Sequence, residues 1–126
     1  MKNPLLGCWR LVCYQTILNG ETLQITKGQS GRLCYTENGV VQLSIQRDPI
    51  LLAQLGLNSQ LSEIFYEGNF EIDNHLSQVK HHILKANISA RVGTSLIRKF
   101  SLESDRLIIT GLGLDSEVQL IWTRDE

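Results

Sequence analysis

The sequence predicts one mainly β domain in which short antiparallel strands form a barrel or a sandwich. Turn dipeptides recur along the chain, among them Asn19-Gly20 and Asn38-Gly39, and these favour tight hairpins because Asn and Gly tolerate positive φ. Runs rich in Val, Ile, Leu, Thr and aromatic residues lie between the turns, and several alternate in polarity. Regularly spaced short strands are typical of barrels and sandwiches.

The length and composition bound the classes of protein. With 126 residues, of which 42% are hydrophobic and 20% charged, we expect a single folded domain over residues 1–126. The net charge of -1 supplies no basic field, so neither nucleic acid nor an anionic membrane is an expected partner. No signal peptide or membrane-spanning run is apparent, and we therefore expect a cytoplasmic protein that is a monomer or a homodimer.

Each predicted element lies between two turn signals. We expect strands at residues 7–17, 22–27, 31–36, 40–46, 64–72, 76–87, 94–102, 106–112 and 117–124. The segment 49–62 differs, since Asp48 can cap a helix, Pro49 suits its first position and leucines follow, which predicts one or two short helices. A plug in one barrel mouth, a lid and an interface all stay open as roles for this segment.

Three cysteines are present, Cys8, Cys13 and Cys34. An odd and sparse set argues against a disulfide scaffold. On a regular strand Cys8 and Cys13 face opposite ways, so this pair cannot easily join. We interpret all three as small apolar fillers.

Alternation identifies the side chains that face the interior. On strand 94–102, Leu96, Phe100 and Leu102 share one face with Arg98, which places a guanidinium among apolar neighbours. Such a group needs a carboxylate, a carbonyl, a ring face or a bound anion. The same reasoning turns further residues inward: Trp9, Leu11, Cys13, Leu33, Tyr35, Val41, Leu43, Ile45, Tyr66, Phe70, Ile72, Val79, His81, Ile83, Val118, Leu120, Trp122 and Arg124.

Six short motifs follow one another along nearly the whole chain: Gly7-Cys8-Trp9-Arg10-Leu11, residues 31–39, residues 66–73, residues 79–82, residues 98–102 and residues 120–124. In this order they resemble the lipocalin-like domain family of bacteria and fungi. The resemblance implies an eight-stranded antiparallel up-and-down lipocalin-like barrel with a ligand-sized interior. It also implies that Trp9 closes one end of the barrel, covered by Arg124. The chain departs from the family pattern at Cys8, at Cys13 and in the leucine-rich segment 50–61.

An apolar interior with a few polar groups predicts a small-molecule cavity. The expected ligand-binding residues are Arg98, His81, Tyr66, Phe70, Trp122, Tyr35 and Leu96. The main hypothesis is a carrier or sensor of a small hydrophobic molecule, with an acidic or phenolic head group as one option for Arg98 to bind.

Two alternatives stay open beside this hypothesis: an isomerase or cyclase of a hydrophobic metabolite, and an interaction module without a ligand. The sequence contains no phosphate-binding loop and no nucleophile motif, which favours binding over catalysis and predicts no cofactor. We also expect no metal, because His81 and His82 are adjacent strand residues that face opposite ways.

Overall fold

The computed structural model describes residues 3–18, 20–54, 56, 62–112 and 117–125, and these residues form a mainly β fold, as predicted. The strands are β1 (Gly7–Leu18), β2 (Glu21–Ile25), β3 (Gln29–Tyr35), β4 (Val40–Arg47), β5 (Glu63–Asp73), β6 (Gln78–Ala86), β7 (Ser95–Glu103), β8 (Arg106–Leu112) and β9 (Glu117–Arg124). A short helix α1 (Pro49–Gln54) follows β4, and a 3₁₀ turn η2 (Ser89–Arg91) links β6 to β7.

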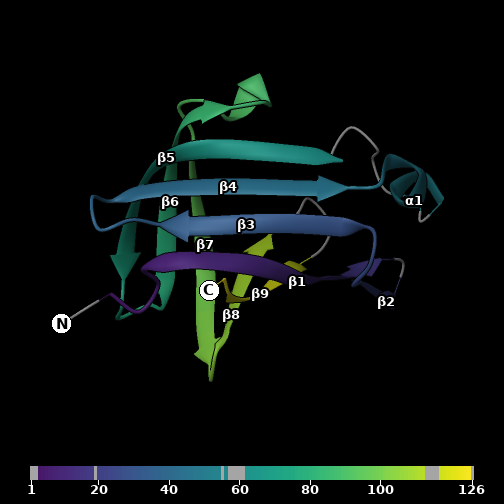
Figure 1. Cartoon of the computed structure of the whole chain (residues 1–126), viewed down its shortest axis with the longest axis horizontal. Coiled ribbons are helices and arrows are strands. Elements are labelled where there is room, and N and C mark those ends of the chain that lie inside the picture. Colours follow the sequence, from purple (N-terminus) through teal and green to yellow (C-terminus); the bar gives the residue numbers. More distant parts are fainter. Residues whose placement is uncertain (1–2, 19, 55, 57–61, 113–116, 126) are drawn as a thin grey trace.

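The strands of the described residues close into an antiparallel barrel (Figure 1). Eight of them follow one another around the ring, from β1 through β3, β4, β5, β6, β7 and β8 to β9, which pairs back with β1. The remaining strand, β2, pairs with the second half of β1, while β3 pairs with its first half. The pairing of the first strand with the last confirms the predicted closed barrel.

Local sequence signals explain the connections. Gly39 takes the positive φ, 83°, that turns β3 into β4, although Asn38 beside it keeps a negative φ, so the hairpin is wider than the tight type that the dipeptide favours. Asp48 caps α1, because its Oδ1 accepts a hydrogen bond from the backbone N–H of Ile50 at 2.9 Å. Residue 55 and residues 57–61 of the predicted helical segment lie outside the described residues.

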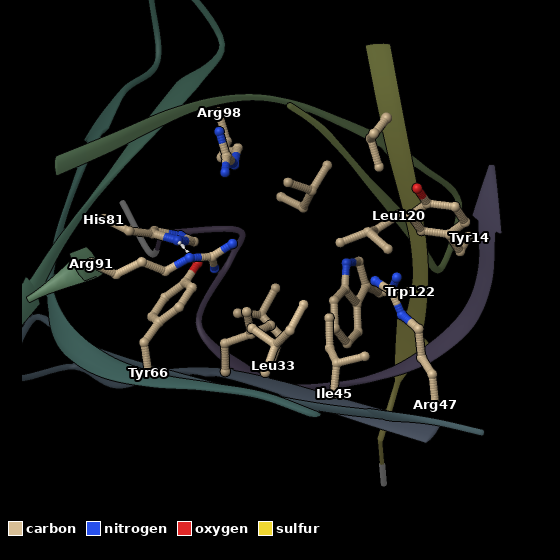
Figure 2. A pocket seen from close by; sticks show the side chains of 14 residues that line it. Tyr14, Leu33, Ile45, Arg47, Tyr66, His81, Arg91, Arg98, Leu120 and Trp122 are labelled. Atoms are coloured by element: carbon tan, nitrogen blue, oxygen red, sulfur yellow. Dashed lines mark hydrogen bonds between the residues drawn. The ribbon is translucent and has the colours of Figure 1, made fainter. Parts of the chain in front are cut away.

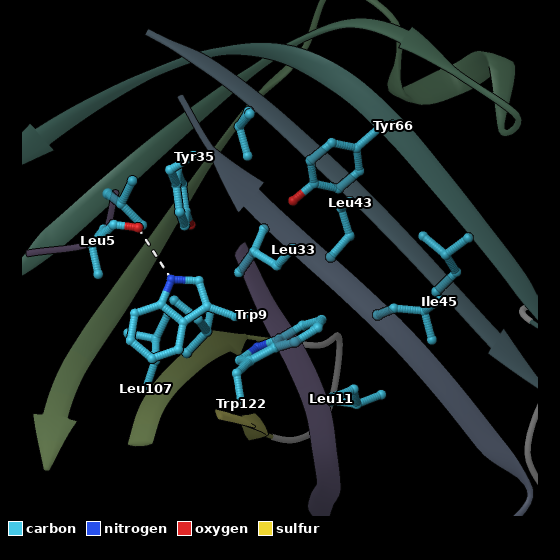
Figure 3. Close-up of a cluster of buried hydrophobic side chains, with 14 of the residues drawn as sticks. Leu5, Trp9, Leu11, Leu33, Tyr35, Leu43, Ile45, Tyr66, Leu107 and Trp122 are labelled. Carbon is cyan, nitrogen blue, oxygen red and sulfur yellow. Dashed lines mark hydrogen bonds between the residues drawn. The ribbon is translucent and has the colours of Figure 1, made fainter. Parts of the chain in front are cut away.

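The core is one cluster of buried side chains from β1, β3, β4, β5, β6, β8 and β9, together with Leu5, inside the barrel (Figure 3). The side chains predicted to face inward on β3 and β4 are buried, as are those of Val79, His81 and Ile83 on β6. At the bend of β5, a side chain at Gly68 would collide with the backbone oxygen of His82, so the close approach of β5 and β6 requires glycine there. Regular alternation therefore predicts most of the interior.

One inward assignment on β1 is wrong, because a β-bulge interrupts the strand between Leu11 and Cys13. Leu11 lies opposite Trp122, but Cys13 lies opposite Ile121 and Tyr14 opposite Leu120. The extra residue reverses the alternation, so that Tyr14 rather than Cys13 shares the inner face with Leu120.

The interpretation of the cysteines also needs correction. Cys8 and Cys34 form a disulfide on paired positions of β1 and β3, with their Cα atoms 4.1 Å apart. Spacing along the chain does not reveal this pair, since only the register of β1 against β3 brings the two residues together. Cys13 is free and buried, as a small apolar filler would be.

Candidate functional site

A cavity of about 270 Å³ lies inside the barrel (Figure 2). Half of its lining residues are aliphatic, namely Leu33, Leu43, Ile45, Ile64, Ile109, Val118 and Leu120, and the others each carry a polar group. The volume is slightly below the usual range for small-molecule sites, which combine apolar walls with a small number of polar groups. The polar groups therefore decide what this cavity can select.

Arg98 extends from β7 into this cavity, as alternation predicts for its side chain. Gly111 on β8 makes room for it, because a Cβ there would lie 3.0 Å from the Arg98 Nε. Burial lowers the pKa of Arg98, while the hydroxyl of Tyr66 acts in the opposite direction. Among the described residues no carboxylate pairs with Arg98. The ion pair between Arg32 and Asp125 involves neither Arg98 nor any other residue that lines the cavity.

A second guanidinium lines the cavity near the first. Arg91 belongs to the 3₁₀ turn η2, and its positive charge lowers the pKa of Arg98. Figure 2 shows Arg91 and Arg98 on the side of the cavity where His81 and Tyr66 lie. Two like charges without a described acidic partner repel each other, and an anion between them would relieve this repulsion.

Two tyrosines hold His81 from both sides. The hydroxyl of Tyr66 lies 2.5 Å from Nδ1 of His81, and the hydroxyl of Tyr35 lies 2.7 Å from Nε2. Burial, with the charge of Arg98 as a smaller cause, lowers the pKa of His81 to about 3. Burial also raises the pKa of Tyr66 to about 12 and that of Tyr35 well above its ordinary value. At neutral pH all three groups are therefore uncharged.

Counting protons assigns the direction of these hydrogen bonds. A neutral imidazole has one N–H donor and one acceptor nitrogen, so one tyrosine donates to His81 and the other accepts from it. The accepting tyrosine keeps a free O–H. Among the described residues the Tyr35 hydroxyl bonds to His81 alone, and a buried O–H without an acceptor costs about 1–3 kcal/mol.

We therefore assign the Tyr35 O–H as the donor to Nε2 and the His81 Nδ1–H as the donor to Tyr66. Tyr66 lines the cavity, so its own O–H is left to donate to a bound molecule. His81 itself has both ring nitrogens occupied, and it acts on the cavity by orienting Tyr66.

The opposite side of the cavity carries a third arginine. Arg47, the last residue of β4, lies with its guanidinium carbon 4.5 Å from the centre of the Tyr14 ring. Its Nε and the indole Nε1 of Trp122 are both buried without an acceptor among the described residues. Both residues line the cavity, which is thus rich in donors and has no carboxylate among its described lining residues.

The structure brings together four of the seven ligand-binding residues that the sequence predicted. Arg98, His81, Tyr66 and Trp122 line the cavity, and Tyr35 touches it only through His81. The remaining two, Phe70 and Leu96, pack against the core and do not line the cavity. The ring of Phe70 meets that of Tyr35 edge-on at 4.8 Å.

Three polar lining residues, Tyr14, Arg47 and Arg91, were missed. Arg47 continues the period-two series of Leu43 and Ile45, so extending the predicted strand by one residue would have found it. Tyr14 was hidden by the bulge, and Arg91 belongs to a turn that has no periodic signal.

Trp9 and Arg124, the two residues predicted to close one end of the barrel, do not line the cavity. Arg124 covers the ring of Trp9 at 3.9 Å, and its guanidinium donates to the backbone oxygens of Pro4 and Leu6. The indole N–H of Trp9 donates to the backbone oxygen of Leu5. The indole N–H of Trp9 and both terminal nitrogens of Arg124 thus bond to the backbone, which is typical of a structural contact.

Within the described ranges, no group of His, Cys, Asp and Glu side chains is arranged to hold a metal ion. The same ranges contain no helix with the length and apolar character needed to cross a membrane.

The closed antiparallel barrel and its interior cavity define a lipocalin-like barrel. A family model described as a lipocalin-like domain matches residues 6–124, and the chain belongs to this family. Among solved structures, a DUF4847 family protein from Bacteroides vulgatus is 14% identical, with a TM-score of 0.51 over 97% of this chain and 96% of that one. Rv2717c from M. tuberculosis is 10% identical, with a TM-score of 0.36 over 98% and 94%. No curated protein matches the chain.

Proposed function

We propose that the barrel binds a small hydrophobic molecule through its interior cavity and holds an acidic or phenolic head group of that molecule at Arg98. The protein would then act as a carrier or sensor. The observation that carries this proposal is a half-buried arginine which faces an apolar cavity and has no carboxylate partner among the described residues. A lipocalin-like barrel suggests ligand binding in general, and the charge of Arg98 would orient the ligand by holding its polar end.

Around Arg98 the polar groups are donors. Arg91 and Arg98 have no acceptor capacity, and the proton count leaves the O–H of Tyr66 to donate as well. An ionised carboxylate or phenolate is an acceptor, and hydrogen bonds to a charged group are roughly twice as strong as neutral ones. A head group of this class therefore matches both the charge and the hydrogen-bonding pattern.

The two alternative functions fit the geometry less well. A cavity of about 270 Å³ argues against a barrel filled by its own side chains. An isomerase or cyclase needs an acid or base that can reach its substrate. His81 lines the cavity, but both of its ring nitrogens are occupied by tyrosine hydroxyls.

A substitution at Arg98 tests the proposal with two probes that share their rings. Anilinonaphthalene sulfonate is anionic, and phenylnaphthylamine is the uncharged counterpart. The Arg98→Met variant keeps most of the side-chain volume, so we expect it to bind the sulfonate about tenfold more weakly, or about 1.4 kcal/mol, and the uncharged probe unchanged. Fluorescence titration gives both affinities.

Lys99→Met is the matched control, because Lys99 follows Arg98 on β7 and is exposed on the outer face. It removes the same charge without touching the cavity, so its affinity for the sulfonate should equal that of the wild type. An equal loss in both variants, or unchanged sulfonate binding in a folded Arg98→Met protein, would overturn the proposal. A variant that unfolds would assign Arg98 to stability instead.

The proposed compartment remains the cytoplasm, and the proposed assembly a monomer or homodimer. The disulfide between Cys8 and Cys34 provides a test of the compartment, because disulfides are rare in the reducing cytosol. Alkylation of free thiols in freshly lysed cells should find this pair reduced if the protein is cytoplasmic.

A further inference from the structure

Arg47 is a charged residue of the cavity that the proposed function does not use. It follows Leu43 and Ile45 on the inner face of β4, at the end of that strand. Its guanidinium lies against the ring of Tyr14, with 4.5 Å between the guanidinium carbon and the ring centre. Burial lowers the pKa of Arg47, and Tyr14 opposes this effect. The tyrosine thus holds the side chain in place and leaves its charge without an anion.

No acidic side chain in the described residues neutralises Arg47. In the part of the chain that the structure describes, no carboxylate lines the cavity and no ion pair involves this arginine. Asp48 follows it in the chain but is exposed, and its Oδ1 caps α1 through the backbone N–H of Ile50. The Nε of Arg47 and the Nε1 of Trp122 are buried donors without an acceptor among the described residues. A buried donor normally has a partner, so these two atoms are free to donate to an acceptor group of a bound molecule.

Arg47 and Arg98 lie on opposite sides of the cavity. Their strands, β4 and β7, are separated by β5 and β6 around a ring of eight strands in the described residues. Figure 2 shows the two guanidinium groups on opposite sides of the cavity, that of Arg98 near His81 and that of Arg47 beside Trp122. One small acidic group bound at Arg98 would leave the charge of Arg47 unpaired.

We propose that the ligand carries two acidic groups, one at each end of an apolar segment, and that Arg98 binds one and Arg47 the other. This inference rests on the proposed function, because both groups bind in the same cavity. Saturated aliphatic diacids are the simplest molecules of this class. A carboxylate has about four lone-pair sites, which is enough to accept from Arg47 and a second donor such as Trp122.

The test compares diacids with their own monomethyl esters, which have the same chain and one fewer charge. Isothermal titration calorimetry over a series from hexanedioate to dodecanedioate gives the affinities. Two fixed ends select one length, so we expect the affinity of the diacids to pass through a maximum. At that length the diacid should bind about tenfold more tightly than its monoester. The affinity of the simple monoacids should instead rise steadily with chain length.

Variants assign the two ends of the ligand. Arg47→Met should abolish the difference between diacid and monoester, whereas Arg98→Met should weaken the binding of both. The exposed Lys99→Met variant serves again as the charge control. If Arg47→Met does not fold, the length maximum and the diacid preference of the wild-type protein still decide the matter.

The outcomes separate the two proposals. Equal binding of diacid and monoester at every length, with Arg98-dependent binding of both, would overturn the second acidic site and leave the proposed function standing. If no binding depends on Arg98, the proposed function is wrong, and the inference of a second acidic group is wrong with it.

Discussion

His81 shows how burial changes the role of a single residue. A histidine in a cavity is the usual choice for acid–base chemistry, since its ordinary pKa lies near neutrality. Here the side chain is 2% exposed and lies between Tyr35 and Tyr66. It is therefore neutral, and it fixes which tyrosine presents a free O–H to the cavity. This description makes His81 a positioning residue, with a measurable consequence for stability.

We predict that the free energy of unfolding decreases as the pH falls from about 6.5 toward 3. Burial lowers the pKa of His81 to about 3, against 6.5 in the unfolded chain, so between these values unfolding takes up a proton. The slope from this residue is at most about 1.4 kcal/mol per pH unit. Urea denaturation at a series of pH values measures it.

A substitution at His81 tests this prediction, and a substitution at the adjacent His82 is the matched control. His81→Phe should reduce the pH dependence of unfolding, whatever it does to stability at neutral pH. His82→Phe changes the adjacent residue, which is exposed and bonds to Ser95 on the outer face, and should keep the wild-type slope. Identical slopes in the two variants would contradict a buried neutral His81.

At the scale of elements, β1 differs from the regular strands that the sequence predicts well. Alternation on β7 placed Arg98 in the cavity, because β7 pairs with both neighbours without a bulge. The strand β1 has a bulge against β9 and exchanges its partner from β3 to β2 halfway along. The inward position of Tyr14 and the disulfide depend on this register. A register between distant strands is a tertiary property, so periodicity within one strand could not predict either.

We predict that the disulfide contributes to stability by joining β1 to β3. These strands pair over a short stretch, from Gly7 opposite Tyr35 to Arg10 opposite Arg32. The bond closes a loop of 26 residues, for which the chain-entropy estimate is about 3.5 kcal/mol. Urea denaturation with and without dithiothreitol gives the difference. A Cys8→Ala/Cys34→Ala variant should be insensitive to the reductant, whereas Cys13→Ala should respond as the wild type does.

Over the whole molecule, the polar groups at Trp9 and those in the cavity differ in how they are satisfied. Trp9 and Arg124 lie outside the cavity lining, contact each other and bond to backbone oxygens of residues 4–6. In the cavity Arg47, Arg98 and Trp122 line a space without an acidic partner among the described residues. The closed barrel and the contact between Trp9 and Arg124 were implied by the resemblance of the sequence motifs to the family, and alternation predicted that Arg98 faces the interior. The opposition of Arg47 and Arg98 was not predicted, because it depends on how the closed barrel places β4 relative to β7.

This division predicts that stability and binding can be changed separately. Trp9 is 1% exposed and does not line the cavity, so Trp9→Ala should lower the free energy of unfolding by about 3–5 kcal/mol, as for other large buried aromatic residues. The folded fraction of this variant should still bind anilinonaphthalene sulfonate as the wild type does. Arg98→Met should give the reverse, with weaker sulfonate binding and a much smaller change in stability. Chemical denaturation and titration of the same samples measure both quantities. A fully stable Trp9→Ala protein, or one that is folded but has lost sulfonate binding, would show that the contact at Trp9 and the cavity do not act independently.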